Sequence, residues 1–284
     1  MKKTTKIWVG LGAFVIAGSG TAMAASATEA AVLETTAPAS AKHGLMSSAA
    51  NIILAQAQGG EGEGGGEGGV DVAAADKDPV QYNIALQVIA AHYYAGFAAY
   101  EAKEMEAGAQ MFAHGLGEVY IEMEDVFKRR GVTTLGKALQ DAVDAAAANK
   151  PVAEVRKLYQ AVLNELKAAE GQGPASSQPA AAVKAQVVVD MLNRAAAQFA
   201  ASQNDKTLEP YLDGLGFAVA ADKESAAVLP TLRKADKKKA DALKAAIDMA
   251  KAVYPGIKRP AKAKVTPAQF LAAASAAQLA VSNW

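Results

Sequence analysis

Apolar residues recur every three or four positions from Pro79 to the C-terminus, and this spacing strongly favours a helical fold. The first such run begins at Asp78-Pro79, where an acid at the cap and a proline in the first turn favour a helix start. Its large apolar side chains mark one helix face: Tyr82, Leu86, Ile89, Tyr93, Phe97 and Tyr100. Neither alternating strand patterns nor hairpin turn signals interrupt the helical spacing. We therefore predict an all-α protein built from bundles of antiparallel helices.

The helical part divides by composition into two units. Residues 79–170 are expected to form four helices joined by short loops, as in an up-down bundle, with the first turn near Lys103. The segment GQGPASSQP, residues 171–179, is a linker rich in helix breakers. Residues 180–284 return to helical spacing and form the second unit.

The N-terminus has the three parts of a bacterial signal peptide. A basic start precedes an apolar run from Ile7 to Ala17, and Ala22-Met23-Ala24 supplies a small-residue cleavage motif. We expect cleavage after Ala24, or after Ala27, and export to the periplasm. Because the apolar run is too short for an anchor and the cleavage region lacks cysteine, the mature chain is expected to carry neither a transmembrane nor a lipid anchor.

Residues 25–78 have the composition of a disordered tether. The segment GGEGEGGGEGG, residues 59–69, combines glycines that lose much entropy on ordering with glutamates that repel one another. This tether also contains His43. A solvated spacer is its simplest role, and weak cation capture by Glu61, Glu63 and Glu67 is the functional alternative.

Charge and residue content exclude several classes of function. Removing the three lysines of the signal leaves 26 basic side chains against 29 acidic ones, which argues against a nucleic-acid partner. The chain has no cysteine, so a metal site must use His, Asp, Glu, Met or Tyr. Nucleophile elbows, phosphate loops and dinucleotide fingerprints are absent from the sequence, and we do not expect an enzyme.

Two histidines lie at matching heights on the first predicted hairpin. His92 precedes Lys103 by eleven residues and His114 follows it by eleven. At about 1.5 Å per residue both imidazoles lie about 16 Å from the turn, level with each other. Glu118 lies one turn beyond His114 and Glu122 one turn further, a spacing that places acids and imidazole on one surface.

These residues predict a metal site, and the packing alternative remains open. The expected ligands are His92, His114, Glu118 and Glu122, with Met111, Glu101 and Asp125 as secondary candidates. Imidazole with carboxylate suits iron, zinc or copper, whereas two facing imidazoles with a nearby methionine suit haem or copper. A histidine beside a helix core can equally be a hydrogen-bonded packing residue, and the acids can form a solvated face.

The same hairpin has a second interpretation. Gly96, Ala99, Phe112 and Gly115 fall near the small and aromatic positions of a tetratricopeptide repeat (TPR). Such a hairpin would make the protein a structural or adaptor protein that binds a partner in a helical groove. Only one repeat of this kind is visible, and solenoids need about three for stability.

The stretch from Ala90 to Val132 resembles a group of uncharacterised exported proteins of alphaproteobacteria. The shared pattern has H-x-x-x-G, a tyrosine, an acidic turn and H-x-x-x-E-x-Y, here His92, Gly96, Tyr100, His114, Glu118 and Tyr120. The stretches QVVVDMLNRAAAQFAAS and LEPYLDGLGFAVAA are weakly similar to helices of imelysin-like periplasmic proteins linked to iron uptake.

The imelysin resemblance is incomplete, because that family's G-x-H-x-x-E signature is missing. Gly117 stands where the acid belongs, with Glu118 one residue later. Glu209 and Asp213 resemble the family's acidic pattern but have no histidine beside them. The resemblance implies a periplasmic binding protein for iron that works with periplasmic or membrane-bound metal-uptake proteins. The ligand types leave copper, zinc and haem as alternatives.

Overall fold

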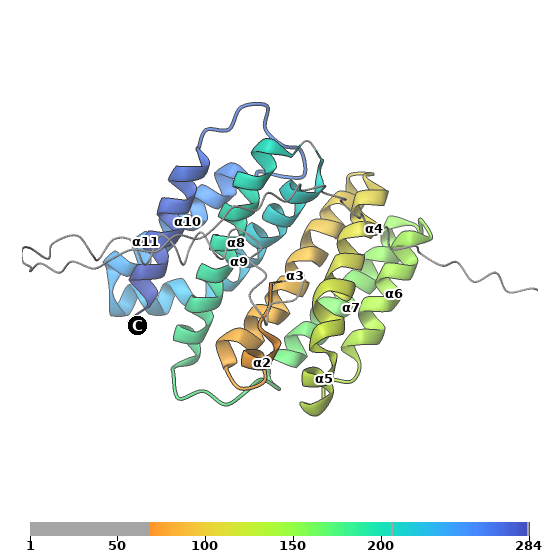
Figure 1. Ribbon diagram of the computed structural model, residues 1–284, viewed down its shortest axis with the longest axis horizontal. Helices are drawn as coiled ribbons and strands as arrows, with labels where there is room; N and C mark the ends of the chain where they lie inside the picture. Colours follow the sequence, from red (N-terminus) through yellow and green to blue (C-terminus); the bar gives the residue numbers. More distant parts are fainter. Residues whose placement is uncertain (1–68, 206, 283) are drawn as a thin grey trace, which may run out of the picture. The chain divides into compact units, whose positions relative to one another are not determined.

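The part of the chain that the structure describes is helical throughout (Figure 1). The structure is a computed structural model that describes residues 69–205, 207–282 and 284. Within these ranges there is no strand, which confirms the all-α prediction. No helix in the same ranges combines the length and the apolar character that a membrane crossing needs. The expected signal peptide, His43 and most of the expected tether lie outside the described residues.

The helix bounds follow the predicted periodicity closely in the first half of the fold. Here the helices are α2 (Val72–Ala75), α3 (Pro79–Glu101), α4 (Met105–His114), the π-helix η1 (Gly115–Tyr120), α5 (Ile121–Arg129), α6 (Leu135–Ala147) and α7 (Val152–Glu170). The elements α4, η1 and α5 follow one another without a break and together form the second long helix that the sequence predicts.

The second half contains α8 (Ala180–Asn204), α9 (Glu209–Ala235), α10 (Lys237–Val253) and α11 (Pro267–Val281). The helix α9 is longer than its first apolar run indicates, since it continues through Pro230. Ser225, Val228 and Leu232 keep its later turns buried at helical spacing, and this packing extends the helix.

The segment from Gly69 to Asp78 packs on the fold, although its composition places it in the tether. Val70 is buried, and the carboxylate of Asp71 caps α2 by accepting from the amide of Ala74. Arg129 forms an ion pair with Asp76 at 3.0 Å, and α2 contacts α3 and α5. A buried side chain, a cap and an ion pair therefore order this end of the expected tether.

The first hairpin turns where the sequence predicts. Lys103 has a positive φ of 75° between α3 and α4. Two glycines let the two helices approach closely: a Cβ on Gly96 would lie 2.6 Å from the Phe112 ring, and one on Gly108 would lie 2.7 Å from the Gly96 carbonyl oxygen. This close packing fixes the register of the two helices, and so the heights of His92 and His114.

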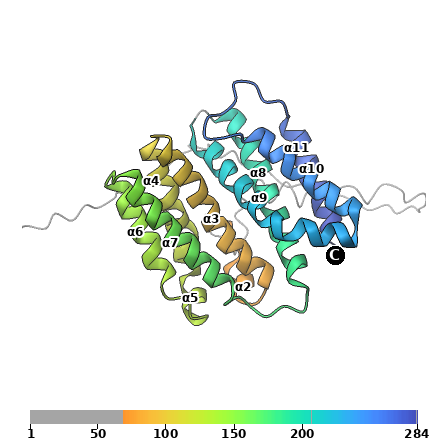
Figure 2. The ribbon, with the colours of Figure 1, turned by 180° about the vertical axis from the view of Figure 1, so that it is seen from behind.

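Helix α3 is the shared core of the two helical groups. It is apolar around most of its circumference, which is the pattern of a helix covered on all sides. It packs against α4 and α7 on one side and against α8 and α9 on the other (Figures 1 and 2). The linker residue Gly173 lies against the Tyr82 ring of α3, and the Tyr82 hydroxyl donates to the carbonyl of Ala169. One continuous hydrophobic core results.

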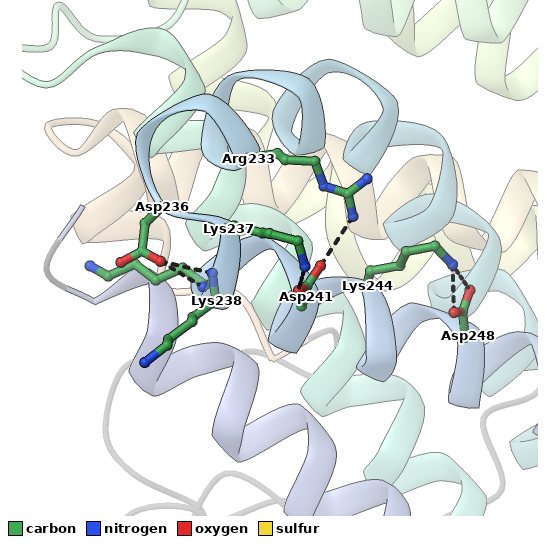
Figure 3. Close-up of polar contacts among 8 residues, drawn as sticks. Arg233, Asp236, Lys237, Lys238, Asp241, Lys244 and Asp248 are labelled. Atoms are coloured by element: carbon green, nitrogen blue, oxygen red, sulfur yellow. Dashed lines mark hydrogen bonds and ion pairs between the residues drawn. The ribbon is translucent and has the colours of Figure 1, made fainter.

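The corner between α9 and α10 is held by charged side chains (Figure 3). Asp236 caps α10, its Oδ1 accepting from the amide of Lys238 at 2.9 Å. The first turn of α10 is basic, which opposes the helix dipole. Asp241 offsets this charge by pairing with Lys237 one turn before it and with Arg233 of α9, whose Nη2 lies 3.2 Å away. The acid therefore ties the two helices together at the corner.

Candidate metal centre

Three helices bring His92, His114 and Asp213 together. They come from α3, α4 and α9, and each offers one ligand atom within 4.8 Å of the others. The two imidazole rings lie edge to face with centroids 6.1 Å apart. The predicted pairing of the two histidines is therefore confirmed, and the ion between them stays a prediction.

The hydrogen bond of His92 leaves one ring nitrogen available as a ligand. Its Nδ1 lies 2.9 Å from the carbonyl oxygen of Val88, which assigns the proton to Nδ1 and the lone pair to Nε2. That Nε2 lies 3.6 Å from Oδ1 of Asp213. Burial lowers the pKa of His92 to about 4, with smaller lowering contributions from His114 and Arg194. The ring is therefore neutral at neutral pH, the form that binds metals.

Asp213 is a buried acid that lacks a compensating group. Its Oδ1 has no hydrogen-bond partner within the described part of the chain. Burial, with smaller contributions from the nearby carboxylates of Glu209 and Glu118, raises the pKa of Asp213 to about 7. A buried carboxylate oxygen without a partner is costly, and a cation beside it would remove that cost.

Two more carboxylates approach His114 from the solvent side. Its Nδ1 lies 3.7 Å from Oε1 of Glu118, and its Nε2 lies 3.8 Å from Oε1 of Glu209. The other oxygen of Glu209 accepts from Gln110 Nε2 at 3.4 Å. Two imidazoles and three carboxylates therefore converge within one small region of the fold.

Glycines and a π-helix hold the three helices close at this level. A Cβ on Gly216 would lie 2.3 Å from the carbonyl oxygen of Ala91, and one on Gly115 would lie 3.2 Å from the Cβ of His92. The π-helix η1 begins directly after His114 and carries Glu118. Such wide helical turns are rare and occur frequently at functional sites.

The structure separates the other predicted ligands from this group. Glu122 is eight residues beyond His114, about 12 Å along the helix at 1.5 Å per residue, and its half-buried side chain is not part of the group. Met111 is buried in the core and Asp125 is exposed. Glu101 pairs with Arg156 beside the hairpin turn. Among the predicted acids, only Glu118 contacts a histidine of the group.

Asp213 is not among the ligands predicted from the sequence, because their spacing covers only the first hairpin. It lies on α9, ninety-nine positions after His114. Its local signal is an acid inside an apolar run, because Tyr211, Leu212 and Leu215 around it are all buried. Together with the flanking Gly214 and Gly216, that pattern marks an acid facing a closely packed helix.

Comparisons with protein-family models, with curated proteins and with solved structures found no match.

Proposed function

We propose that this helical protein binds a transition-metal ion through His92, His114 and Asp213. The observation that carries the proposal is the pair formed by His92 Nε2 and Asp213 Oδ1, a nitrogen lone pair and a buried oxygen without a hydrogen-bond partner, which lie 3.6 Å apart. A metal ion is the partner that would satisfy both atoms. The hydrogen bond from His92 Nδ1 to Val88 supplies the support from outside the coordination sphere that metal-binding histidines usually have.

The ligand chemistry favours iron. Two imidazoles with a carboxylate form a set typical of non-haem iron(II), and zinc or copper(II) accept the same donors. The chain has no cysteine and Met111 lies outside the group, so soft copper(I) is disfavoured. Haem is disfavoured as well, because the Asp213 carboxylate lies against the nitrogen that a porphyrin iron would need.

The role that fits such a site is binding in metal uptake or homeostasis rather than catalysis. The N-terminal sequence supports a periplasmic location, and periplasmic or membrane-bound uptake proteins are the partners that this location suggests. Mass spectrometry of the protein from its native cell fraction tests the location. A mature N-terminus after Ala24 or Ala27 is expected, and a mature form that retains Lys2 would contradict export.

Calorimetric titration of the full chain tests the metal proposal. Iron(II) under anaerobic conditions, zinc, copper(II) and haem are added separately to wild type and to His92→Ala, His114→Ala and Asp213→Asn. Each substitution is expected to weaken iron(II) binding by about 100-fold or more, since even residues outside the coordination sphere contribute about 10–100-fold. His43→Ala and Asp125→Asn are the matched controls and should bind like wild type.

Unchanged iron, zinc and copper affinity in all three variants would overturn the metal proposal and favour the adaptor alternative. Gly96 and Phe112 do pack together as a TPR-like hairpin requires. However, α8 and α9 cover the α3 side of that hairpin, and this packing favours the metal proposal over a peptide groove.

A further inference from the structure

The five converging side chains form a graded path from solvent to the interior. The exposed fraction of the side chain is 45% for Glu209 and 31% for Glu118, then 18% for His114, 14% for Asp213 and 6% for His92. The two most exposed groups are carboxylates, and the least exposed group is a neutral imidazole. The pair of His92 and Asp213 therefore lies deepest, and the carboxylates of Glu118 and Glu209 lie outermost.

His114 stands between the two ends of this path. Its two ring nitrogens face different carboxylates, Glu118 at 3.7 Å and Glu209 at 3.8 Å, while its ring packs edge to face with that of His92. Gln110 binds Oε2 of Glu209, so Oε1 is the oxygen directed at the imidazole. An ion held by either glutamate is already within reach of His114.

The geometry points to Glu118 and Glu209 as an entrance that captures a hydrated divalent cation and passes it by way of His114 to His92 and Asp213. This inference rests on the proposed metal site. Paired carboxylates at a partly exposed mouth attract small cations and raise their association rate. They also repel anionic complexes, so the substrate is the free aquo ion rather than a metal carried by citrate or another anionic chelator.

Association and dissociation rates distinguish an entrance, which speeds metal association, from an ordinary pair of ligands, which slows metal dissociation. The full chain is loaded with zinc and mixed with a fluorescent chelator to obtain the dissociation rate, and calorimetry gives the affinity, from which the association rate follows. In the double variant Glu118→Gln/Glu209→Gln the association rate is expected to fall by about tenfold or more and to lose most of its salt dependence. Asp213→Asn should instead raise the dissociation rate.

A matched control separates the effect of where the two carboxylates lie from the effect of net charge. Glu106→Gln/Asp125→Asn removes the same two charges from exposed positions on α4 and α5 and should leave the association rate as in wild type. Circular dichroism verifies that each variant is folded. A zinc–citrate mixture in which the metal is almost fully complexed should load the wild type only at the rate set by free zinc.

The outcomes distinguish this inference from the function on which it rests. If wild type binds zinc and the glutamate variant keeps its association rate, the entrance is overturned and the metal site stands. The entrance is also overturned if the glutamate variant behaves like Asp213→Asn, so that its whole loss of zinc affinity comes from a faster dissociation rate. If wild type binds none of zinc, iron(II) and copper(II), both proposals are wrong.

Discussion

At the scale of single residues, Asp213 and His92 are two buried groups whose protonation is set by the same low-dielectric surroundings. Burial favours the neutral form of each group, so it raises the pKa of Asp213 and lowers the pKa of His92. A bound metal ion would instead be coordinated by the ionised carboxylate of Asp213 and the neutral imidazole of His92.

The pH dependence of stability tests this description of the metal-free site. His92 has a folded pKa of about 4 against an ordinary 6.5, so its contribution to stability is lost as pH falls from 6.5 towards 4. Asp213 has a folded pKa of about 7 against 3.8, so its contribution is lost as pH rises from 3.8 towards 7. Between pH 4 and 6.5 the two slopes oppose each other.

Removing the acid at position 213 should leave the pH dependence of stability that His92 contributes without the opposing contribution of Asp213. In Asp213→Asn, without metal, the free energy of unfolding is expected to rise with pH between 4.5 and 6.5 more steeply than in wild type, by up to about 1.4 kcal/mol per pH unit. Urea unfolding at several pH values in the presence of a chelator measures it, with Asp125→Asn as the exposed control. Parallel curves for wild type and Asp213→Asn would contradict the pKa of Asp213.

At the scale of helices, the sequence predicts the histidine hairpin well and the third residue of the group, Asp213, poorly. The turn at Lys103 and the heights of His92 and His114 follow from local spacing, because an α-helix rises about 1.5 Å per residue and the two helices meet at the same turn. Asp213 depends on where α9 docks against α3. That contact is set by Gly216 and Ala91, which lie more than a hundred residues apart, so periodicity carries no information about it.

The docking of α9 predicts opposite outcomes for two glycine substitutions. Gly216→Ala places a methyl 2.3 Å from a backbone oxygen of α3, so it should destabilise the fold by about 1–3 kcal/mol and weaken metal binding by moving Asp213 away from His92. Gly117→Ala meets nothing within 4 Å and should be neutral or stabilising by up to about 1 kcal/mol. Chemical unfolding and metal titration measure both. Equal stability of the two variants would argue against close packing of α3 on α9.

At the scale of the whole molecule, α3 makes the two helical groups depend on each other. Composition divides the chain at residues 171–179, and each group has its own regular helix spacing. The division does not extend to the core, because α3 packs on α7 and on α9 at once. The sequence shows the linker of nine polar and small residues. It does not show that α3 packs against helices on both sides of that linker, because this packing depends on tertiary contacts.

One cooperative unfolding transition is therefore expected for the folded part. Leu139→Ala in α6 and Leu243→Ala in α10 remove fully buried side chains from opposite groups, each at a cost of about 2–5 kcal/mol. Both should lower the midpoint of the same calorimetric transition by about 5–15 °C. Leu279→Ala, at an exposed position on α11, should change it little. Two transitions, each moved by one variant alone, would show that the groups fold separately.

The position of a bound iron ion is the most direct test of whether His92, His114 and Asp213 form a metal site. Crystals of the iron-loaded protein, measured on either side of the iron absorption edge, reveal the ion as a peak in the anomalous difference map. We expect one peak about 2.0–2.3 Å from Nε2 of His92 and from a carboxylate oxygen of Asp213, with His114 in the same coordination sphere. An iron peak elsewhere, with His92 and Asp213 in contact only with each other, would contradict it.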